Sequence, residues 1–126
     1  MVLNERQALT LWRRTVVASV RSDKPDLTAR QQAILLTVSL TRGPHTVRGL
    51  SETLDVAKPA ITRALDTLTR SNLVRRVKDE SDLRNVFIER TQEGAEYLRG
   101  FAELILAAEQ GEPEPPGQTG DSEAVA

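Results

Sequence analysis

The sequence predicts a mainly α-helical fold that carries one small β-hairpin. Up to residue 72 and again after 91, apolar residues recur three or four positions apart, which is the period of an amphipathic helix. Between residues 73 and 90 the pattern changes to two short β-favouring runs joined by a polar segment. Only 3% of the 126 residues are aromatic, so alanine, leucine and valine must build the core, which favours helix packing over a sheet sandwich. The length suits one compact domain, which we expect to span residues 1–110.

The first helix is expected over residues 5–21, and the second over residues 29–40. The second is indicated by Thr28 and Gln31, which have the spacing of a capping box ahead of an apolar run. A Gly-Pro pair follows this run and should end the helix. The first helix should carry an apolar stripe along one face, formed by Leu9, Leu11, Trp12, Val16, Val17 and Val20.

Two further helices are expected to follow with only a tight turn between them. Thr46 can cap a short third helix, and a fourth should begin near Pro59, a residue that suits a first helical turn. Asn72 is expected to end the fourth helix in the left-handed conformation. The apolar residues of the third helix are Val47, Leu50 and Leu54, and those on the buried face of the fourth are Ile61, Leu65 and Leu68.

The β-favouring runs 73–78 and 86–90 are expected to form a hairpin. Thr91 then resembles the cap of a last helix that ends near Gln110. One side of this helix should carry Leu98, Phe101, Leu104, Ile105 and Ala108, with Tyr97 beside them. From Gly111 onward the chain is rich in glycine, proline and acid and has almost nothing to bury, so we expect a disordered acidic tail over 111–126.

A short helix, a tight turn, a second helix and a hairpin make up a winged helix-turn-helix, an arrangement that binds double-stranded DNA. Such a unit places its second helix in the major groove, where Thr62 and Arg63 would read base edges. Lys58, at the start of that helix, would bind phosphate. Arg84 near the tip of the hairpin would enter the minor groove, with Asp82 orienting its side chain.

The residues expected to contribute to DNA binding lie on the third and fourth helices and on the hairpin. They are Thr46, Lys58, Ala60, Thr62, Arg63, Thr67, Arg75, Arg76, Lys78, Asp82 and Arg84.

The net charge of −1 hides an uneven distribution along the chain. Residues 109–126 contain five acidic and no basic residues, whereas residues 1–108 contain 17 basic and 13 acidic ones. The body of the protein therefore carries +4 and the tail −5, and a basic body suits a nucleic-acid partner.

The segment VAKPAITRALDTLTRSNLVRRVKDESDLRNVFIERTQEG, residues 56–94, resembles the MarR family of bacterial regulators. The resemblance rests on the helix, the strand that begins Leu73-Val74, the D-x-R wing tip and the closing T-x-x-G. It implies a sequence-specific transcriptional regulator, formed as a homodimer through its N- and C-terminal helices (about 5–21 and 92–110). It also implies a pseudo-palindromic DNA site and a small-molecule effector of unknown identity.

This chain departs from the family pattern at three places. Ala57 stands where a capping serine is common, Asn72 where glycine is usual, and Leu83 replaces the first of two wing arginines. In addition, the last helix is short for a dimerisation end. These departures bear on affinity and on dimer geometry.

The main alternative is a winged-helix protein-interaction module that modulates another regulator without binding DNA. An enzyme has little support, because one histidine (His45), no cysteine and no clustered carboxylates leave no nucleophile-base pair or metal site to name, and we expect no cofactor. Trp12, Tyr97 and Phe101 are aromatic candidates for an effector cavity, but core or dimer contacts are the more common role of such residues. No segment is apolar enough to cross a bilayer and no signal peptide is recognisable, so we expect a cytoplasmic protein.

Overall fold

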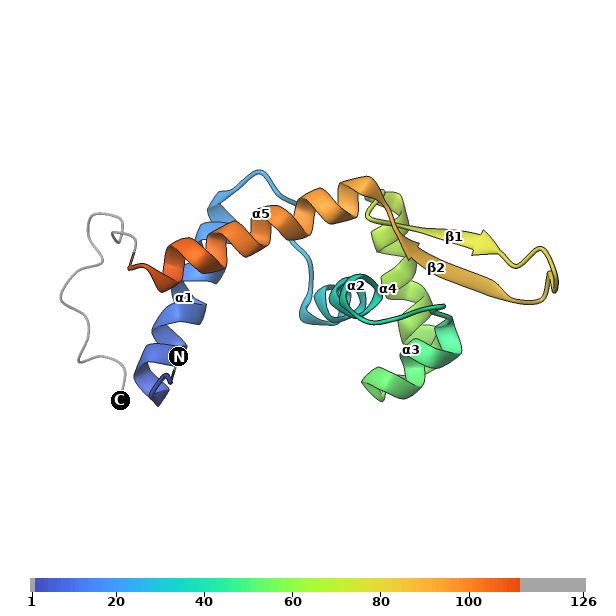
Figure 1. Ribbon diagram of the computed structural model, residues 1–126, viewed down its shortest axis with the longest axis horizontal. Helices are drawn as coiled ribbons and strands as arrows, with labels where there is room; N and C mark the ends of the chain where they lie inside the picture. The colour runs from blue at the N-terminus through green and yellow to red at the C-terminus, as the bar shows by residue number, and fades with distance from the viewer. Residues whose placement is uncertain (1, 112–126) are drawn as a thin grey trace. The chain divides into compact units, whose positions relative to one another are not determined.

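A computed structural model of the chain describes residues 2–111, and these form two compact units. One unit consists of residues 25–99, and the other combines residues 2–24 with residues 100–111. The expected tail over 111–126 lies, apart from Gly111, outside the described residues. Along the chain (Figure 1), the elements are α1 (Glu5–Arg21), α2 (Ala29–Leu40), α3 (Val47–Leu54), α4 (Lys58–Arg70), β1 (Val74–Lys78), β2 (Val86–Arg90) and α5 (Gln92–Glu109). The prediction of a mainly helical fold with one hairpin is therefore confirmed.

The helices begin where side chains can satisfy the free backbone N–H groups of a first turn. The predicted capping box of α2 is present: the Thr28 hydroxyl accepts a hydrogen bond from Gln31 N at 3.1 Å, and the Gln31 amide accepts one from Thr28 N at 2.9 Å. A second capping box, between Asn4 and Gln7, starts α1 and was missing from the sequence prediction.

The α3-turn-α4 segment has the tight connection that the sequence predicts. Thr46 caps α3 by accepting a hydrogen bond from Gly49 N at 3.0 Å. Asp55 ends the helix in the left-handed conformation, with φ of 54°, and the chain turns at once into α4. Ala57, in contrast, precedes α4 without a side-chain cap, and Pro59 lies in the first turn as expected. Asn72 also adopts the left-handed conformation after α4, with φ of 58°.

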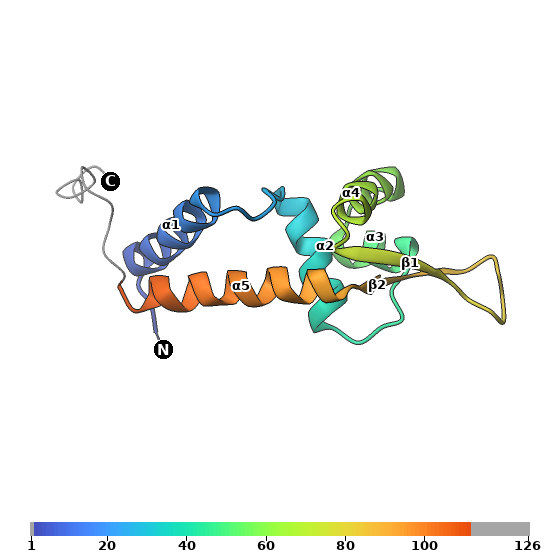
Figure 2. The ribbon, with the colours of Figure 1, turned by 90° about the horizontal axis from the view of Figure 1, so that it is seen from above.

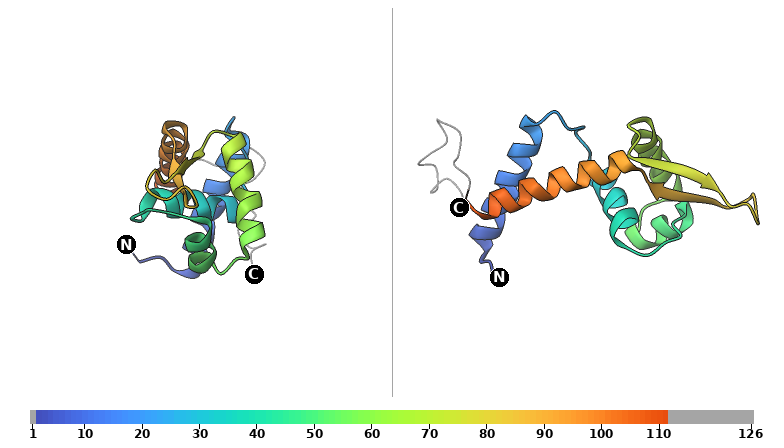
Figure 3. Two further views of the ribbon diagram at one scale, coloured as in Figure 1. Left: turned by 90° about the vertical axis from the view of Figure 1, so that its right-hand side faces the viewer. Right: turned by 45° about the horizontal axis from the view of Figure 1, so that its top comes forward.

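The hairpin is antiparallel, with Val74 opposite Arg90 and Lys78 opposite Val86. Figures 2 and 3 show its loop projecting beyond α3 and α4 within the unit 25–99. The sequence did not predict that the segment before α3 joins it: His45 forms an isolated bridge with Ile88, whose N–H donates to the His45 carbonyl oxygen at 2.8 Å. The inner strand β2 thus has backbone partners on both sides at this position.

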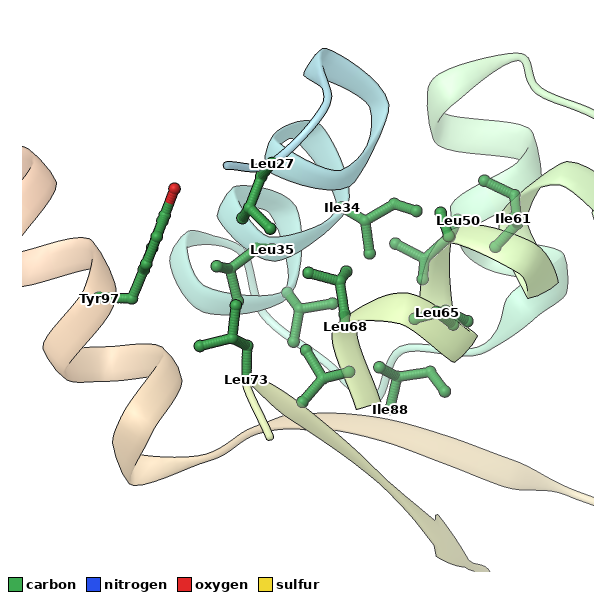
Figure 4. Packing of buried hydrophobic residues seen from close by; sticks show 13 residues of the cluster. Leu27, Ile34, Leu35, Leu50, Ile61, Leu65, Leu68, Leu73, Ile88 and Tyr97 are labelled. Atoms are coloured by element: carbon green, nitrogen blue, oxygen red, sulfur yellow. The ribbon is translucent and has the colours of Figure 1, made fainter. Parts of the chain in front are cut away.

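Leucine and isoleucine side chains from the three helices α2 to α4 and the hairpin form one core in the unit 25–99 (Figure 4). The predicted buried face of α4 is confirmed, since Ile61, Leu65 and Leu68 are fully buried. This core holds α4 by one face and leaves the opposite face to solvent. The buried cluster consists of Leu27, Ile34, Leu35, Val38, Leu50, Ile61, Ala64, Leu65, Leu68, Leu73, Val74, Ile88 and Tyr97.

The other unit contains α1 and the end of α5. Ala108 and Thr15 are its buried residues, and the Thr15 hydroxyl donates to the Leu11 carbonyl oxygen at 2.9 Å. The Trp12 and Phe101 rings lie 6.3 Å apart. The expected apolar stripe of α1 lies largely on the exposed side of the described chain, with Leu9, Trp12, Val16 and Val20 all exposed. No helix within residues 2–111 has the length and apolarity that a membrane span requires.

Candidate nucleic-acid interface

The exposed face of α4 carries the residues that the sequence assigns to base reading. Because Ile61 and Leu65 point into the core, the helical period turns Thr62 and Arg63 away from it, and both are exposed. Lys58 is exposed as well, at the start of the helix. Lys58 is the first residue of the helix, where the free N–H groups and the helix dipole favour an anion. This face can therefore offer a hydroxyl, a guanidinium and an ammonium group to a polyanion.

Ala60 and Thr67, which were expected to contribute to DNA binding, are half-buried on α4. Together with Arg63 they line an open groove of about 460 Å³ between α4 and the start of α2, whose other lining residues are Thr28, Ala29, Arg30, Gln31 and Ala64. The Thr67 hydroxyl also accepts a hydrogen bond from Arg70 Nη2 at 3.3 Å. Both residues thus border the exposed face and do not stand at its centre.

Arg30 is a cationic residue that the sequence prediction did not include. It is exposed in the first turn of α2 and lines the same groove as Arg63. The capping box at Thr28 places it at a helix start, and a basic residue in the first turn of the helix before a helix-turn-helix is the signal that could have identified it.

Thr46 is also half-buried, and its hydroxyl accepts the Gly49 N–H that it caps. The structure therefore gives Thr46 a local role in starting α3.

On β1, Arg75 and Arg76 are ion-paired. The Arg75 guanidinium reaches Glu89, its direct neighbour on β2, through Nε at 3.2 Å and Nη2 at 2.9 Å. Arg76 extends back to α4, where Nη2 lies 2.8 Å from Asp66 Oδ1 and Nη1 lies 3.3 Å from Thr69 Oγ1. Exposed pairs of this kind contribute about 0–1 kcal/mol each, so phosphate can compete for these arginines at low cost. Lys78, at the end of β1, is exposed.

The loop at the tip of the hairpin brings Asp82 and Arg84 together. The Asp82 carboxylate accepts hydrogen bonds from Arg84 N at 3.1 Å, Nε at 3.0 Å and Nη2 at 3.0 Å. These bonds lower the pKa of Asp82, with the Arg84 side chain as the largest cause, and they raise the pKa of Arg84. The Arg84 side chain is nevertheless 90% exposed, so it is oriented without being covered.

Comparison with known proteins places this arrangement in a family. The family model described as MarR family matches residues 27–86. A transcriptional regulator from Thermotoga maritima is similar in structure, with a TM-score of 0.64 and 25% identity over 79% of this chain and 66% of that one. No curated protein matches the chain in sequence.

Two of the similar structures contain DNA. A mutant of S. aureus MepR bound to an oligodeoxyribonucleotide has a TM-score of 0.70 and 20% identity, covering 82% of this chain and 73% of its own. A mutant of MarR from E. coli complexed with operator DNA has a TM-score of 0.62 and 24% identity, covering 85% of this chain and 71% of its own. At these identities the likeness establishes the fold. The matched residues run from the start of α2 through the wing loop, and residues 27–86 therefore belong to the MarR family of winged helix-turn-helix transcriptional regulators.

Proposed function

We propose that the protein regulates transcription by binding a specific, pseudo-palindromic DNA site as a homodimer, with α4 in the major groove and the hairpin tip in the minor groove. The observation that carries this proposal is the exposed face of α4, with Lys58, Thr62 and Arg63, in one compact unit with a wing tip that displays an oriented Arg84. In this assignment Thr62 and Arg63 contact base edges, and Lys58 contacts phosphate. The DNA-bound relatives with the same fold support it.

A binding titration with arginine variants tests the proposal. The probe is a duplex that the wild-type protein selects from a random-sequence library, and the readout is fluorescence anisotropy at several salt concentrations. Arg63→Ala should cost about 1–3 kcal/mol and relax sequence preference, whereas Lys58→Ala should weaken binding to all sequences and reduce the salt slope by about one. Arg99→Ala, which removes an exposed arginine from α5, is the control for the change in charge. Unchanged binding in both test variants would contradict the assignment of α4 to the major groove.

The dimer is supported by the uncovered apolar stripe of α1 and by exposed apolar residues near the end of α5. Leu9, Val20 and Leu106 are 54%, 67% and 59% exposed. Exposed apolar patches on a protein commonly mark a surface that binds another protein. We propose that a second copy of the chain covers it, so that residues 1–110 form one functional module with α1 and α5 as dimerisation helices.

The double variant Leu9→Glu with Leu106→Glu should sediment as a monomer, because it places charge on both apolar surfaces. It should also lose its preference for duplexes with two half-sites over those with one. Leu83→Glu introduces the same charge at an exposed leucine on the hairpin, and it should leave the oligomeric state unchanged. A double variant that remains dimeric would refute this choice of interface.

The alternative, a protein-interaction module without DNA binding, draws on a specific observation. Arg75, Arg76 and Arg84 are each paired with a carboxylate, which reduces the positive potential of the wing. Titration with duplex DNA, starting at low salt, separates the two functions. A DNA-binding protein binds at low salt and loses affinity steeply as the salt concentration rises, whereas the interaction module shows no binding even at low salt.

The family resemblance also supports a small-molecule effector, which a thermal-shift screen of aromatic acids would detect through ligand-induced stabilisation.

A further inference from the structure

The wing tip exposes a leucine beside the oriented arginine. Within the unit 25–99, the exposed large apolar residues are Leu36, Leu40 and Leu83, and only Leu83 lies on the hairpin. Its side chain is 69% exposed and adjoins Arg84 in sequence. A single exposed leucine is ordinary on a protein surface, so its surroundings must decide whether it has a role.

The loop that carries Leu83 is held by its own hydrogen bonds. Asp79 N donates to the Asn85 carbonyl oxygen at 3.0 Å, and the Asp79 carboxylate accepts from Ser81 N at 2.9 Å and Ser81 Oγ at 2.7 Å. Two consecutive turns follow, closed by Asp82 N to Asp79 O at 3.2 Å and by Asn85 N to Asp82 O at 2.9 Å. Because the loop is ordered before any partner arrives, contact through its apex costs little additional backbone entropy.

Leu83 and Arg84 are the two central residues of the second turn, between Asp82 and Asn85. Glycine, asparagine, aspartate and serine are the residues that favour turns, so turn formation does not explain a leucine at this position. The Asp82 carboxylate binds the Arg84 backbone and guanidinium, which fixes the residue next to Leu83. Leu83 and Arg84 thus form a paired apex, one apolar and one cationic.

We propose that Leu83 enters the minor groove of DNA together with Arg84 and packs against the base edges and sugars as an apolar wedge. Apolar side chains that enter this groove partly unstack a base step, and pyrimidine-purine steps such as TA unstack most easily. The contribution of Leu83 to affinity therefore depends on how easily the base step under the wing is deformed, whereas the contribution of Arg84 depends on the negative potential of the minor groove. This inference rests on the proposed function and adds a specificity determinant to it.

The test uses the full-length dimer and the duplex selected by the wild-type protein. Hydroxyl-radical footprinting locates the base step under the wing tip, which is then set to TA, AA or GC. Leu83→Ala should weaken binding about tenfold on the TA duplex, equivalent to about 1.4 kcal/mol, and it should remove most of the preference for TA over GC. The salt slope should stay unchanged, because the variant removes no charge.

Two companion variants should behave differently from Leu83→Ala. Leu83→Met keeps an apolar side chain of similar volume and should retain the TA preference. Arg84→Ala removes a cation and should reduce the salt slope on all three duplexes. Equal melting temperatures for wild type and Leu83→Ala would establish that the fold is intact.

The outcomes separate this inference from the function on which it rests. A wild-type protein that binds no duplex at low salt overturns both. If wild type binds and Arg84→Ala weakens binding, but Leu83→Ala binds within about twofold of wild type on every duplex, then only the role of Leu83 is overturned. A loss of equal size on TA, AA and GC duplexes also overturns the wedge, because such a contact would not depend on the deformability of the step.

Discussion

Replacing Gly94 with alanine should destabilise the unit 25–99, because this glycine permits a close approach between α5 and the start of β1. Gly94 is buried in the first turn of α5, and a Cβ there would collide with the Leu73 carbonyl oxygen and lie 3.0 Å from Arg90 Cγ. The Leu73 carbonyl cannot withdraw freely. It accepts a hydrogen bond from Thr91 N at 3.2 Å, and the N–H of Leu73 donates to the Leu68 carbonyl oxygen at 2.9 Å.

The expected change in the free energy of unfolding is the sum of two destabilising contributions and one stabilising contribution. Overpacking a buried site costs about 1–3 kcal/mol, and weakening the Thr91 to Leu73 hydrogen bond adds about 1 kcal/mol. The higher helix propensity of alanine returns about 1 kcal/mol. The net loss in the free energy of unfolding is therefore about 2 kcal/mol, which lowers the melting temperature of a domain of this size by about 8 °C.

Urea and thermal denaturation followed by circular dichroism measure this loss directly. Gly49→Ala is the matched control, since a Cβ at that position in α3 would meet only Thr46 Oγ1, at 3.3 Å. We expect Gly49→Ala to change stability by less than about 1 kcal/mol, the size of the propensity difference. A Gly94→Ala protein that melts at the wild-type temperature or above would show that the Leu73 carbonyl yields freely, and the argument from close approach would be wrong.

Three further predictions concern titration and backbone conformation. Burial, followed by the charge of Asp26, raises the pKa of Tyr97, so its contribution to stability is complete below pH 10.0 and is lost as pH rises through the higher folded pKa. Ultraviolet difference absorbance of this single tyrosine measures the midpoint, and a midpoint at or below 10.0 would contradict its burial. Hydrogen bonds from Arg84 lower the pKa of Asp82 below 3.8, so the wing tip should stay ordered until pH falls through that lower value, and the Arg84 amide signal in NMR titrations should report it. A transition above 3.8 would argue against the pairing. Asn72→Ala should cost about 1–2 kcal/mol in chemical denaturation, because alanine adopts φ of 58° less readily than asparagine and the side-chain bond to Glu93 at 2.9 Å is lost. Asn72→Gly loses the same bond but is not strained at this φ, so it should cost less than Asn72→Ala. Equal stability of the two variants would remove the case for strain.

The features that could be predicted from the sequence are those that depend on a few neighbouring residues. The Thr28 and Thr46 caps, the left-handed Asn72 and the buried face of α4 all follow from local hydrogen bonding or helical period. The Asp82–Arg84 contact belongs to the same class, because the two residues are separated by one position within a turn.

Features that depend on residues far apart in the chain could not be predicted from the sequence. The partner of Arg76 is Asp66, ten positions away on another element, and only the packing of α4 against β1 brings them together. The bridge between His45 and Ile88 spans an even longer separation. For α1, the helical period predicted an apolar stripe correctly in sequence, but a period cannot tell which surface covers it, and Thr15 is the residue that this helix buries.

The bridge at His45 also determines how the hairpin opens. A two-stranded hairpin alone is marginally stable in water, and its amides exchange rapidly with solvent. Because the Ile88 amide donates to a third backbone segment, its exchange requires the loop before α3 to separate from β2. Hydrogen exchange should therefore be slower at Ile88 than from residue 79 to residue 85, where the hydrogen bonds are all local to the loop. Limited proteolysis should cut the wing at that loop and spare its base, and it would leave α3 and α4 joined to a nicked but still folded hairpin.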